Sequence, residues 1–410
     1  MAKRLSYNTL DVFTTQLFTG NQLGLVHVPA GTTLTQPQKQ RIAKEFNYSE
    51  SVFLYERTSD SSAATYDAQI FLPTAEIPFA GHPTIGTAVW IFDNLEKDSD
   101  EITINLKAGP VPVKFDRATG TAAATIPHNV RVHSKRIPWG RVVECQPGLA
   151  SAREPLPDSS VPIASIVSGV SFALVDMTAQ PELLANVVIT KDDIAEAGDL
   201  DEGWQHGLLG NVFYYVKPDQ GDGVVRIRQR MMAINLEDPA TGAACSALVA
   251  YLALQRGGRA ERYKFEIEQG VEMGRASVIF VDVVLREDEQ GVERIELKGQ
   301  AVEVMEGSLR VSIAYIKSAK SNWIRTHGYG HVPCIHSCSI LPKVPRPLSA
   351  DIQHHNHVLE RTHLGEAFLE CYQVCVARHR YRDPEFFDVD KNQSFSGVGG
   401  KPAYRWYDSY

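Results

Sequence analysis

The sequence predicts an α+β protein with two pseudo-symmetric lobes, each a sheet or barrel wrapped around a central helix, followed by a C-terminal appendage. Three observations predict this architecture. Many short segments alternate apolar and polar residues, as strands do. A strand, a loop with an acidic residue and a helix that is apolar almost all round follow one another twice, and such a helix must be enclosed by other structure. Beyond about residue 316 the composition changes.

The length and charge of the chain narrow the classes of protein to which it can belong. Its 410 residues, 43% of them apolar and 22% charged, suffice for two or three domains with buried cores. A net charge of -8 argues against a general binder of nucleic acid, whose phosphates attract basic surfaces, and favours a small-molecule partner. Six scattered cysteines are typical of a reducing compartment, so we expect a cytoplasmic protein.

No segment predicts membrane association. The most apolar stretch, residues 161–175, is about 15 residues long, whereas a helix needs about 20 to span a bilayer. Its central serines and glycine indicate two strands joined by a turn. The first residues lack the apolar core of a signal peptide, so we expect neither a secretory signal nor an anchor there.

The first elements along the chain are two strands, a helix and two more strands. Thr35 can cap the helix, and Pro37 fits its first turn, where the missing N–H costs nothing. Glu50 follows this helix and opens the next strand, a position from which its side chain can point into a binding site. The expected ranges are residues 5–28 (two strands around a turn), 35–47 (the helix), 51–55 and 66–72 (strands).

The repeated strand, loop and helix order indicates an internal duplication. Each loop has an acid, Glu76 or Glu237, and then a proline three residues before a glycine that runs into the helix. Two similar halves allow the two loops to face each other across a binding site. The first copy covers residues 66–72, 73–86 and 87–92, and the second covers residues 224–231, 235–242 and 243–254.

These elements define the expected domains. We place the N-terminal lobe at residues 1–125, joined by a returning strand near 309–316, and the C-terminal lobe at residues 126–308. Residues 317–410 form a partly disordered appendage with one helix near 358–379. This appendage holds eight of the 13 histidines and four of the six cysteines. Glycines separate the last four expected strands, at residues 263–269, 276–285, 295–304 and 309–316.

The two loops end in helix starts that could bind an anion. The first N–H groups of a helix have no partner within it and attract a carboxylate, and glycine lets the backbone approach a ligand closely. Two facing helix starts would hold a small acid between them. The residues expected to bind substrate are therefore Gly81, Pro83, Thr84, Thr241, Gly242 and Ala243.

Glu50, His82 and Asp238 are the candidates for acid and base chemistry. A carboxyl group shielded from water is pushed toward its neutral form, which can bring its pKa near working pH and let it take and return a proton. Each of the three could alternatively be structural, as a cap, a loop contact or a turn former. Two of them lie in the repeated loops, which favours a shared site.

Six short blocks, taken together and in order, resemble the PhzF (phenazine biosynthesis-like) family over residues 1 to about 316. The central blocks, around Gly81-His82-Pro83-Thr84 and Glu237-Asp238-Pro239-Ala240-Thr241-Gly242, are specific in combination. The six are Asp11-Val12-Phe13, Phe18-Thr19-Gly20-Asn21, Ser49-Glu50-Ser51, residues 79–86, residues 237–242, and Gln269-Gly270 through Gly274-Arg275.

The resemblance implies the diaminopimelate-epimerase-like fold, with the active site between two lobes and a homodimer as the common assembly. It implies an isomerase without cofactor, metal or nucleotide, which moves a proton between carbons of trans-2,3-dihydro-3-hydroxyanthranilate or a similar carboxylate. Carried over, Glu50 transfers the proton and His82 and Asp238 support it. Ala243 stands where the family often has serine, so a hydroxyl contact to the substrate is lost.

Two alternatives stay open. A racemase or epimerase could use Cys245 as acid or base, although this site offers one thiol where the related epimerases use two. A noncatalytic small-molecule binding protein could keep the lobes without turnover. In the appendage, Cys371, Cys375 and His379 share one helix face, a pattern that fits either zinc or a half-buried helix; we expect no metal.

Overall fold

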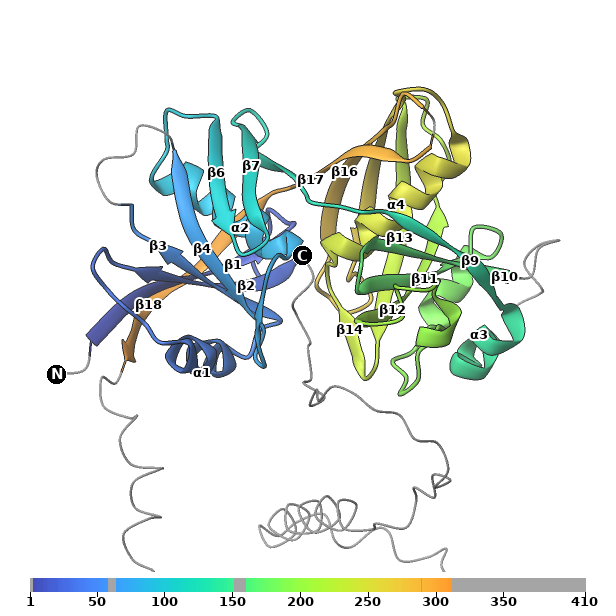
Figure 1. Cartoon of the computed structure of the whole chain (residues 1–410), viewed down its shortest axis with the longest axis horizontal. Coiled ribbons are helices and arrows are strands. Elements are labelled where there is room, and N and C mark those ends of the chain that lie inside the picture. The colour runs from blue at the N-terminus through green and yellow to red at the C-terminus, as the bar shows by residue number, and fades with distance from the viewer. Residues whose placement is uncertain (1–2, 58–63, 151–159, 289, 312–410) are drawn as a thin grey trace, which may run out of the picture. The chain divides into compact units, whose positions relative to one another are not determined.

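The computed structural model describes residues 3–57, 64–150, 160–288 and 290–311, and this part of the chain is rich in sheet (Figure 1). It contains 18 strands, four α-helices and three short 3-10 helices. The predicted α+β class is confirmed. No helix within the described ranges is long and apolar enough to cross a bilayer.

The first half of this region surrounds helix α2 with strands. Ten of the 14 residues of α2 are buried, and α2 packs against β1, β2, β3, β6, β7, β8 and β18. The Phe92 ring of α2 stacks on Phe115 of β7 at a centroid distance of 4.6 Å. The elements are β1 (Lys3–Val12), β2 (Asn21–Val28), α1 (Gln36–Phe46), β3 (Glu50–Tyr55), β4 (Thr65–Phe71), β5 (Glu76–Ile77), α2 (Gly81–Asn94), β6 (Glu101–Leu106), β7 (Gly109–Asp116) and β8 (Thr121–Thr125).

The second half surrounds helix α4 in the same manner. Helix α4 packs against β10, β11, β12, β15, β16 and β17. The elements are β9 (Arg131–Pro138), α3 (Trp139–Cys145), η1 (Pro147–Leu149), β10 (Ser160–Val167), β11 (Val170–Asp176), η2 (Pro181–Asn186), η3 (Ala197–Asp199), β12 (Leu208–Val216), β13 (Val224–Ala233), β14 (Leu236–Asp238), α4 (Gly242–Arg256), β15 (Arg262–Gln269), β16 (Ser277–Leu285), β17 (Val292–Gly299) and β18 (Ala301–Val311).

The strand pairing of the first half recurs in the second. Strands β1, β2, β3, β4 and β6 are joined in the order antiparallel, parallel, antiparallel, parallel. Strands β10, β11, β12, β13 and β15 follow the same order. The short strands β5 and β14 each pair with the strand before them and lead into α2 and α4. The repeated loops of the sequence therefore lie in equivalent places in the two halves.

Strand β9, although grouped above with the second half, and strand β18 hold equivalent places: each follows the strands of one half in the chain and pairs with the first strand of the other half. Strand β9 follows the first half and pairs with β10, whereas β18 follows the second half and pairs along β1 (Figure 1). Strands β8 and β17 also pair directly. The apolar side chains around α2 and α4 form one continuous core. The division into lobes at residues 1–125 and 126–308 stays a prediction.

Two details of the expected strands are wrong. Strand β18 runs unbroken through Gly307, and the turn lies earlier, at Gln300 between β17 and β18. Gly307 faces Tyr7 on β1, whose ring a Cβ atom would meet at 2.8 Å. This glycine therefore makes room for an aromatic ring and does not form a turn.

The two halves differ in what covers their outer faces. Helix α1 covers the first sheet, and its start is fixed by the Gln38 side chain, which accepts the Thr35 N–H at 2.8 Å. The second half has η2 and η3 at the corresponding place in the chain, over a separate apolar cluster with α3. The predicted appendage at residues 317–410, with its helix and its cysteines and histidines, lies outside the described residues.

Candidate active site

The two central helices begin next to each other. A Cβ atom on Gly81, the first residue of α2, would lie 3.4 Å from the Cα atom of Gly242, the first residue of α4. Each would also press on the Leu297 side chain, at 2.6 Å and 2.9 Å respectively. Glycine at both positions therefore permits this close approach. The first N–H groups of both helices, which lack partners within their own helix, are brought together at one place.

The backbone before β3 places Glu50 at this site. Helix α1 ends at Asn47, whose left-handed φ of 52° turns the chain so that Glu50 begins β3 beside Leu23 of β2. The Glu50 side chain is 16% exposed, and its Oε2 atom is buried without a hydrogen-bond partner among the described residues. Burial raises the pKa of Glu50 to about 7, against a smaller opposing effect of the Ser49 hydroxyl.

His82 lies beside Glu50. The Nδ1 atom of His82 is 3.6 Å from Glu50 Oε2, and the histidine side chain is only 5% exposed. Burial lowers the pKa of His82 to about 4, and the negative charge of Asp238 opposes this in part. The ring is therefore neutral at pH 7, so the contact with Glu50 is not a pair of full charges.

Asp238 reaches the same place from β14 in the second half. Its Oδ2 accepts the Thr241 hydroxyl at 2.6 Å, and its Oδ1 accepts the side-chain amide of Asn21 at 3.0 Å. Burial, followed by the nearby charge of Glu50, raises the pKa of Asp238 to about 6. The negative charge of Glu50 thus makes ionisation of Asp238 less favourable.

Asn21 joins these groups and was missed as a site residue. Its side-chain amide donates to Asp238 and, at 3.0 Å, to the Ala240 carbonyl, and lies 3.5 Å from His82 Nδ1. Its Oδ1 accepts the Ser49 hydroxyl at 3.4 Å. In the sequence, Thr19-Gly20-Asn21 is typical of the turn expected between the first two strands. In the structure, Asn21 is only 3% exposed, and a buried amide needs such partners.

The structure brings Glu50, His82 and Asp238 together, and places the expected binding residues around the two helix starts. Two hydroxyls among them already have acceptors. Thr84 donates to the Ala80 carbonyl at 2.7 Å, and Thr241 donates to Asp238. Gly81 and Gly242 open the helices, Pro83 is buried in the first turn of α2, and Ala243 follows Gly242 with a methyl side chain.

Cys245 lies behind this site and is enclosed. Its side chain is fully buried, 3.1 Å from the Gln229 amide nitrogen and 3.6 Å from Gln269 Oε1. Burial raises the pKa of the Cys245 thiol far above its ordinary value. A thiol held in its neutral form in this way is a poor base.

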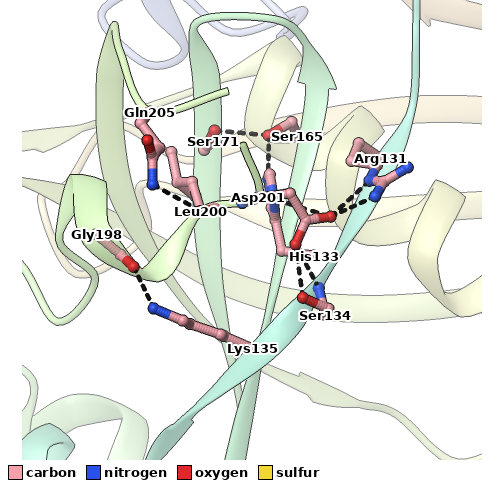
Figure 2. A network of polar contacts seen from close by, with 10 residues as sticks. All are labelled: Arg131, His133, Ser134, Lys135, Ser165, Ser171, Gly198, Leu200, Asp201 and Gln205. Atoms are coloured by element: carbon pink, nitrogen blue, oxygen red, sulfur yellow. Dashed lines mark hydrogen bonds and ion pairs between the residues drawn. The ribbon is translucent and has the colours of Figure 1, made fainter. Parts of the chain in front are cut away.

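A second polar cluster contains serine, histidine and aspartate, the residue types of a catalytic triad, but its hydrogen bonds give it a structural role (Figure 2). His133 Nδ1 accepts the Asp201 backbone N–H at 3.0 Å, so the neutral ring carries its proton on Nε2, which lies 2.8 Å from Ser165 Oγ. His133 therefore donates to Ser165 and cannot remove its proton. Ser165 and Ser171 are fully buried. The cluster fixes the chain around Asp201 to β9 and β10.

The described residues show no group of three or more His, Cys, Asp or Glu side chains placed to hold a metal ion. Glu76 and Glu237, the acids of the repeated loops, have structural partners outside the active site. Glu76 accepts hydrogen bonds from the Gln36 and Gln69 amides. Glu237 pairs with the Arg230 guanidinium through two hydrogen bonds of 2.8 Å.

Comparison with known proteins gives a consistent set of relatives. Residues 10–307 match the model of the phenazine biosynthesis-like protein family. A trans-2,3-dihydro-3-hydroxyanthranilate isomerase of Pseudomonas chlororaphis is 29% identical over 311 residues, which are 74% of this chain and 98% of that protein. The corresponding isomerase of Pseudomonas fluorescens is 28% identical over 309 residues, 74% of this chain and 99% of that protein.

Solved structures support the fold. A PhzF-family protein of Bacillus anthracis superposes with a TM-score of 0.59 at 20% identity, covering 75% of this chain and 99% of that one. A predicted epimerase of Pseudomonas aeruginosa superposes with a TM-score of 0.55 at 24% identity, covering 76% of this chain and all of that one.

Proposed function

Since the chain belongs to the phenazine biosynthesis-like protein family, we propose that it is an isomerase that moves a proton between two carbons of a small carboxylate. The relatives named as isomerases match it over almost their whole length. The observation that carries the proposal is the placement of Glu50. Its carboxyl is nearly enclosed, beside His82 and at the adjoining starts of α2 and α4.

The proposed reaction needs one carboxyl group for both proton transfers. Glu50, as carboxylate, takes a proton from a carbon of the substrate, and the electron pair of that C–H bond spreads into the adjoining double bonds. Glu50 then returns the proton to another carbon of the same system, so atoms and charge balance without a co-reactant. A pKa near 7 suits both steps, because the group can be ionised before the first and protonated before the second.

The neighbouring groups assist this transfer. The first N–H groups of α2 and α4 would hold the substrate carboxylate and meet the negative charge that develops on the substrate. Neutral His82 positions the Glu50 carboxyl, Asp238 supports the site from the second half, and Asn21 holds Asp238 in place. The proposed catalytic residues are thus Glu50, His82 and Asp238, with Gly81, Pro83, Thr84, Thr241, Gly242 and Ala243 around the bound acid.

We further propose that the two halves are the lobes of a diaminopimelate-epimerase-like fold, with the site between them. The repeated strand pairing and the exchange of β9 and β18 support this division. A homodimer and a cytoplasmic location stay predictions. The burial of Cys245 and its raised pKa argue against a racemase that uses this thiol.

Incubation in heavy water tests the proposed activity. The probe is trans-2,3-dihydro-3-hydroxyanthranilate, the substrate named for the relatives, and the readout is NMR of deuterium incorporation at ring carbons. Enzyme-dependent incorporation together with a shifted double bond is the expected result.

Ala243 favours one alternative outcome. It offers no hydroxyl where the family often has serine, which fits a different substrate or a binding protein without turnover. A ligand that raises the melting temperature but gains no deuterium at carbon would establish the binding protein and overturn the isomerase. A set of cyclic and amino-acid carboxylates, screened first by thermal shift, extends the same test to other substrates.

A further inference from the structure

Residues 269–275, which begin with the last residue of β15, contact both sides of the site. We name them the bridging loop. At its start, Gln269 is fully buried and donates to the Asp238 carbonyl at 2.7 Å. The Oε1 atom of Gln269 also accepts the Thr241 N–H at 3.2 Å. Gln269 therefore fixes the backbone at both ends of the segment that carries Asp238 into α4.

The backbone of the bridging loop passes directly against this segment. Gly270 has a left-handed φ of 73°, and a Cβ atom there would lie 2.5 Å from the Pro239 carbonyl oxygen. Glycine is thus required by both conformation and space. The Arg275 N–H then donates to the Gly270 carbonyl at 2.9 Å, which closes the loop into a compact turn.

At the end of the loop, the Arg275 side chain crosses to the first half. Its Nε donates to the Gly20 carbonyl at 3.0 Å, and its terminal nitrogen donates to Asp11 Oδ1 at 2.6 Å. The Gly20 N–H in turn donates to the Ala276 carbonyl at 3.0 Å. Gly20 directly precedes Asn21, so these contacts fix the backbone next to the residue whose side chain donates to Asp238.

Asp11 strengthens this connection from the other side. It is 4% exposed, and its second oxygen accepts the Phe18 N–H at 2.6 Å. Phe18 has a φ of 67°, in the left-handed region that favours glycine, and its own side chain is 69% exposed. The two oxygens of Asp11 thus bind Arg275 on one side and the turn that delivers Asn21 on the other.

We propose that Arg275 is a positioning residue, which sets the distance between Asn21 and Asp238 by joining the Asp11–Gly20 turn to the bridging loop. Gln269 holds the Asp238 side of the site, and Arg275 holds the Asn21 side. The two ends of one short loop therefore fix both partners of the hydrogen bond that joins the halves at the active site. The kinetic part of this inference rests on the proposed proton transfer, and the structural part does not.

The test compares Arg275→Gln with a matched control, Arg262→Gln. Arg262 pairs with Asp282, which is 4% exposed like Asp11, and also with Glu296 at 3.0 Å. These partners lie on β16 and β17. Asp282 keeps a second partner, the Lys298 ammonium at 2.6 Å, so Arg262→Gln should lose less stability than Arg275→Gln. The control therefore shows what the loss of an arginine–aspartate pair away from the site does to His82, and only the Arg275 variant should disturb the site.

The first readout is the pKa of His82, followed by NMR of the imidazole in the full chain. In Arg275→Gln and in Asp11→Asn, water should reach the loosened site, and the pKa of His82 should rise from about 4 toward its ordinary 6.5. Arg275→Lys should give an intermediate value, because lysine can pair with Asp11 but lacks the planar fork that also reaches Gly20. Arg262→Gln should leave the pKa unchanged.

The second readout is turnover of trans-2,3-dihydro-3-hydroxyanthranilate. Arg275→Gln should lower kcat about 10- to 100-fold with little change in KM, since small misplacements of supporting groups are that costly. The double variant with Asp11→Asn should add little to either single change. A His82 pKa and a kcat that both match those of Arg262→Gln would overturn the inference. If no variant, nor the unaltered protein, turns over the probe while the pKa shifts as expected, the positioning role stands and the proposed function fails.

Discussion

The loops that lead into α2 and α4 share three residues, a glutamate, a proline and a glycine, which we call the frame, and differ at the positions between and after them. Each has a glutamate, a proline two residues later and a glycine three residues after that, and each passes from a short strand into a buried helix. The strands before and after them pair in the same order. The shared residues are Glu76, Pro78 and Gly81 in one loop and Glu237, Pro239 and Gly242 in the other.

Two of the four positions that differ between the loops carry the proposed chemistry. Ile77 in the first loop corresponds to Asp238 in the second, and His82 corresponds to Ala243. One half thus supplies the histidine and the other the aspartate, whereas Glu50 comes from neither loop. The comparison teaches that the repeated residues bring the two helix starts to equivalent places, whereas the proposed chemistry depends on His82 and Asp238, which are not repeated.

The largest effect should follow from Glu50→Gln, which leaves both loops intact. Without a group that can take and return a proton, deuterium exchange into trans-2,3-dihydro-3-hydroxyanthranilate should fall about 100- to 10,000-fold. Circular dichroism should show an unchanged fold. Glu76→Gln is the control, because Glu76 belongs to the frame and its amide partners lie outside the site; its exchange rate should equal that of the unaltered protein.

The two frame glutamates should differ in their effect on stability. Glu237 and Arg230 form a pair in which both side chains are under 10% exposed, and Glu237→Gln leaves a buried guanidinium without its counterion. The free energy of unfolding should fall by about 3 to 5 kcal/mol. Glu76→Gln, which exchanges amide contacts only, should cost about 1 kcal/mol or less. Urea denaturation of both variants measures the free energy of unfolding. Equal losses would show that the buried Glu237–Arg230 ion pair stabilises its loop no more than the amide contacts of Glu76 stabilise the other loop.

His82→Ala makes position 82 identical to Ala243 and so removes one difference between the loops. Together with Asp238→Asn, it should lower kcat on the order of 100-fold, as for loss of one electrostatic group in an active site. Ligand binding by thermal shift should persist in both variants, because these residues assist the transfer. Full turnover in both would leave the two loops with a structural role only.

The smallest effect concerns what the loops share. Gly81→Ala and Gly242→Ala each push a methyl group against Leu297, at 2.6 Å and 2.9 Å. Each should cost about 1 kcal/mol of stability, the lower range for overpacking, because the end of a leucine can shift. Since both press on one side chain, the double variant should cost less than the sum of the single ones. Calorimetry checks this, and strict additivity would mean that the helix starts do not share a neighbour.

The sequence predicts the frame well because its signals are local. The two apolar helices, each preceded by a Pro-Xaa-Xaa-Gly segment, are predicted close to α2 and α4. Helix α2 begins at Gly81, before the predicted residue 87, because proline is tolerated in a first helical turn and the loop residues 81–86 are therefore already helical. Strands β6 to β9 and β12 were not predicted. At Gly307, β18 continues opposite Tyr7, which lies 300 positions earlier in the chain, and no local pattern reveals such a partner.

The candidate site was predicted only for residues whose type suggests chemistry. Glu50, His82 and Asp238 do lie together. Asn21 and Gln269 were missed, because a turn explains the first and a strand end explains the second, and their roles arise from contacts across more than 25 residues of chain. Thr84 was expected to donate to a ligand, but in a helix its hydroxyl can donate to the carbonyl four residues earlier, as it does here.

The protonation of Glu50 tests the central claim most directly. Carbon-13 NMR of the side-chain carboxyl, assigned by comparison with Glu50→Gln, follows its titration without any substrate. A pKa near 7 is expected, so that ionisation of the base, and with it the exchange rate, increases as pH rises from 6 to 8. The sign for stability is opposite: since the folded-state pKa lies above the ordinary 4.5, the Glu50 contribution to stability is lost as pH rises from about 4.5 to 7. A carboxyl that titrates near 4.5, as in open solvent, would contradict the account.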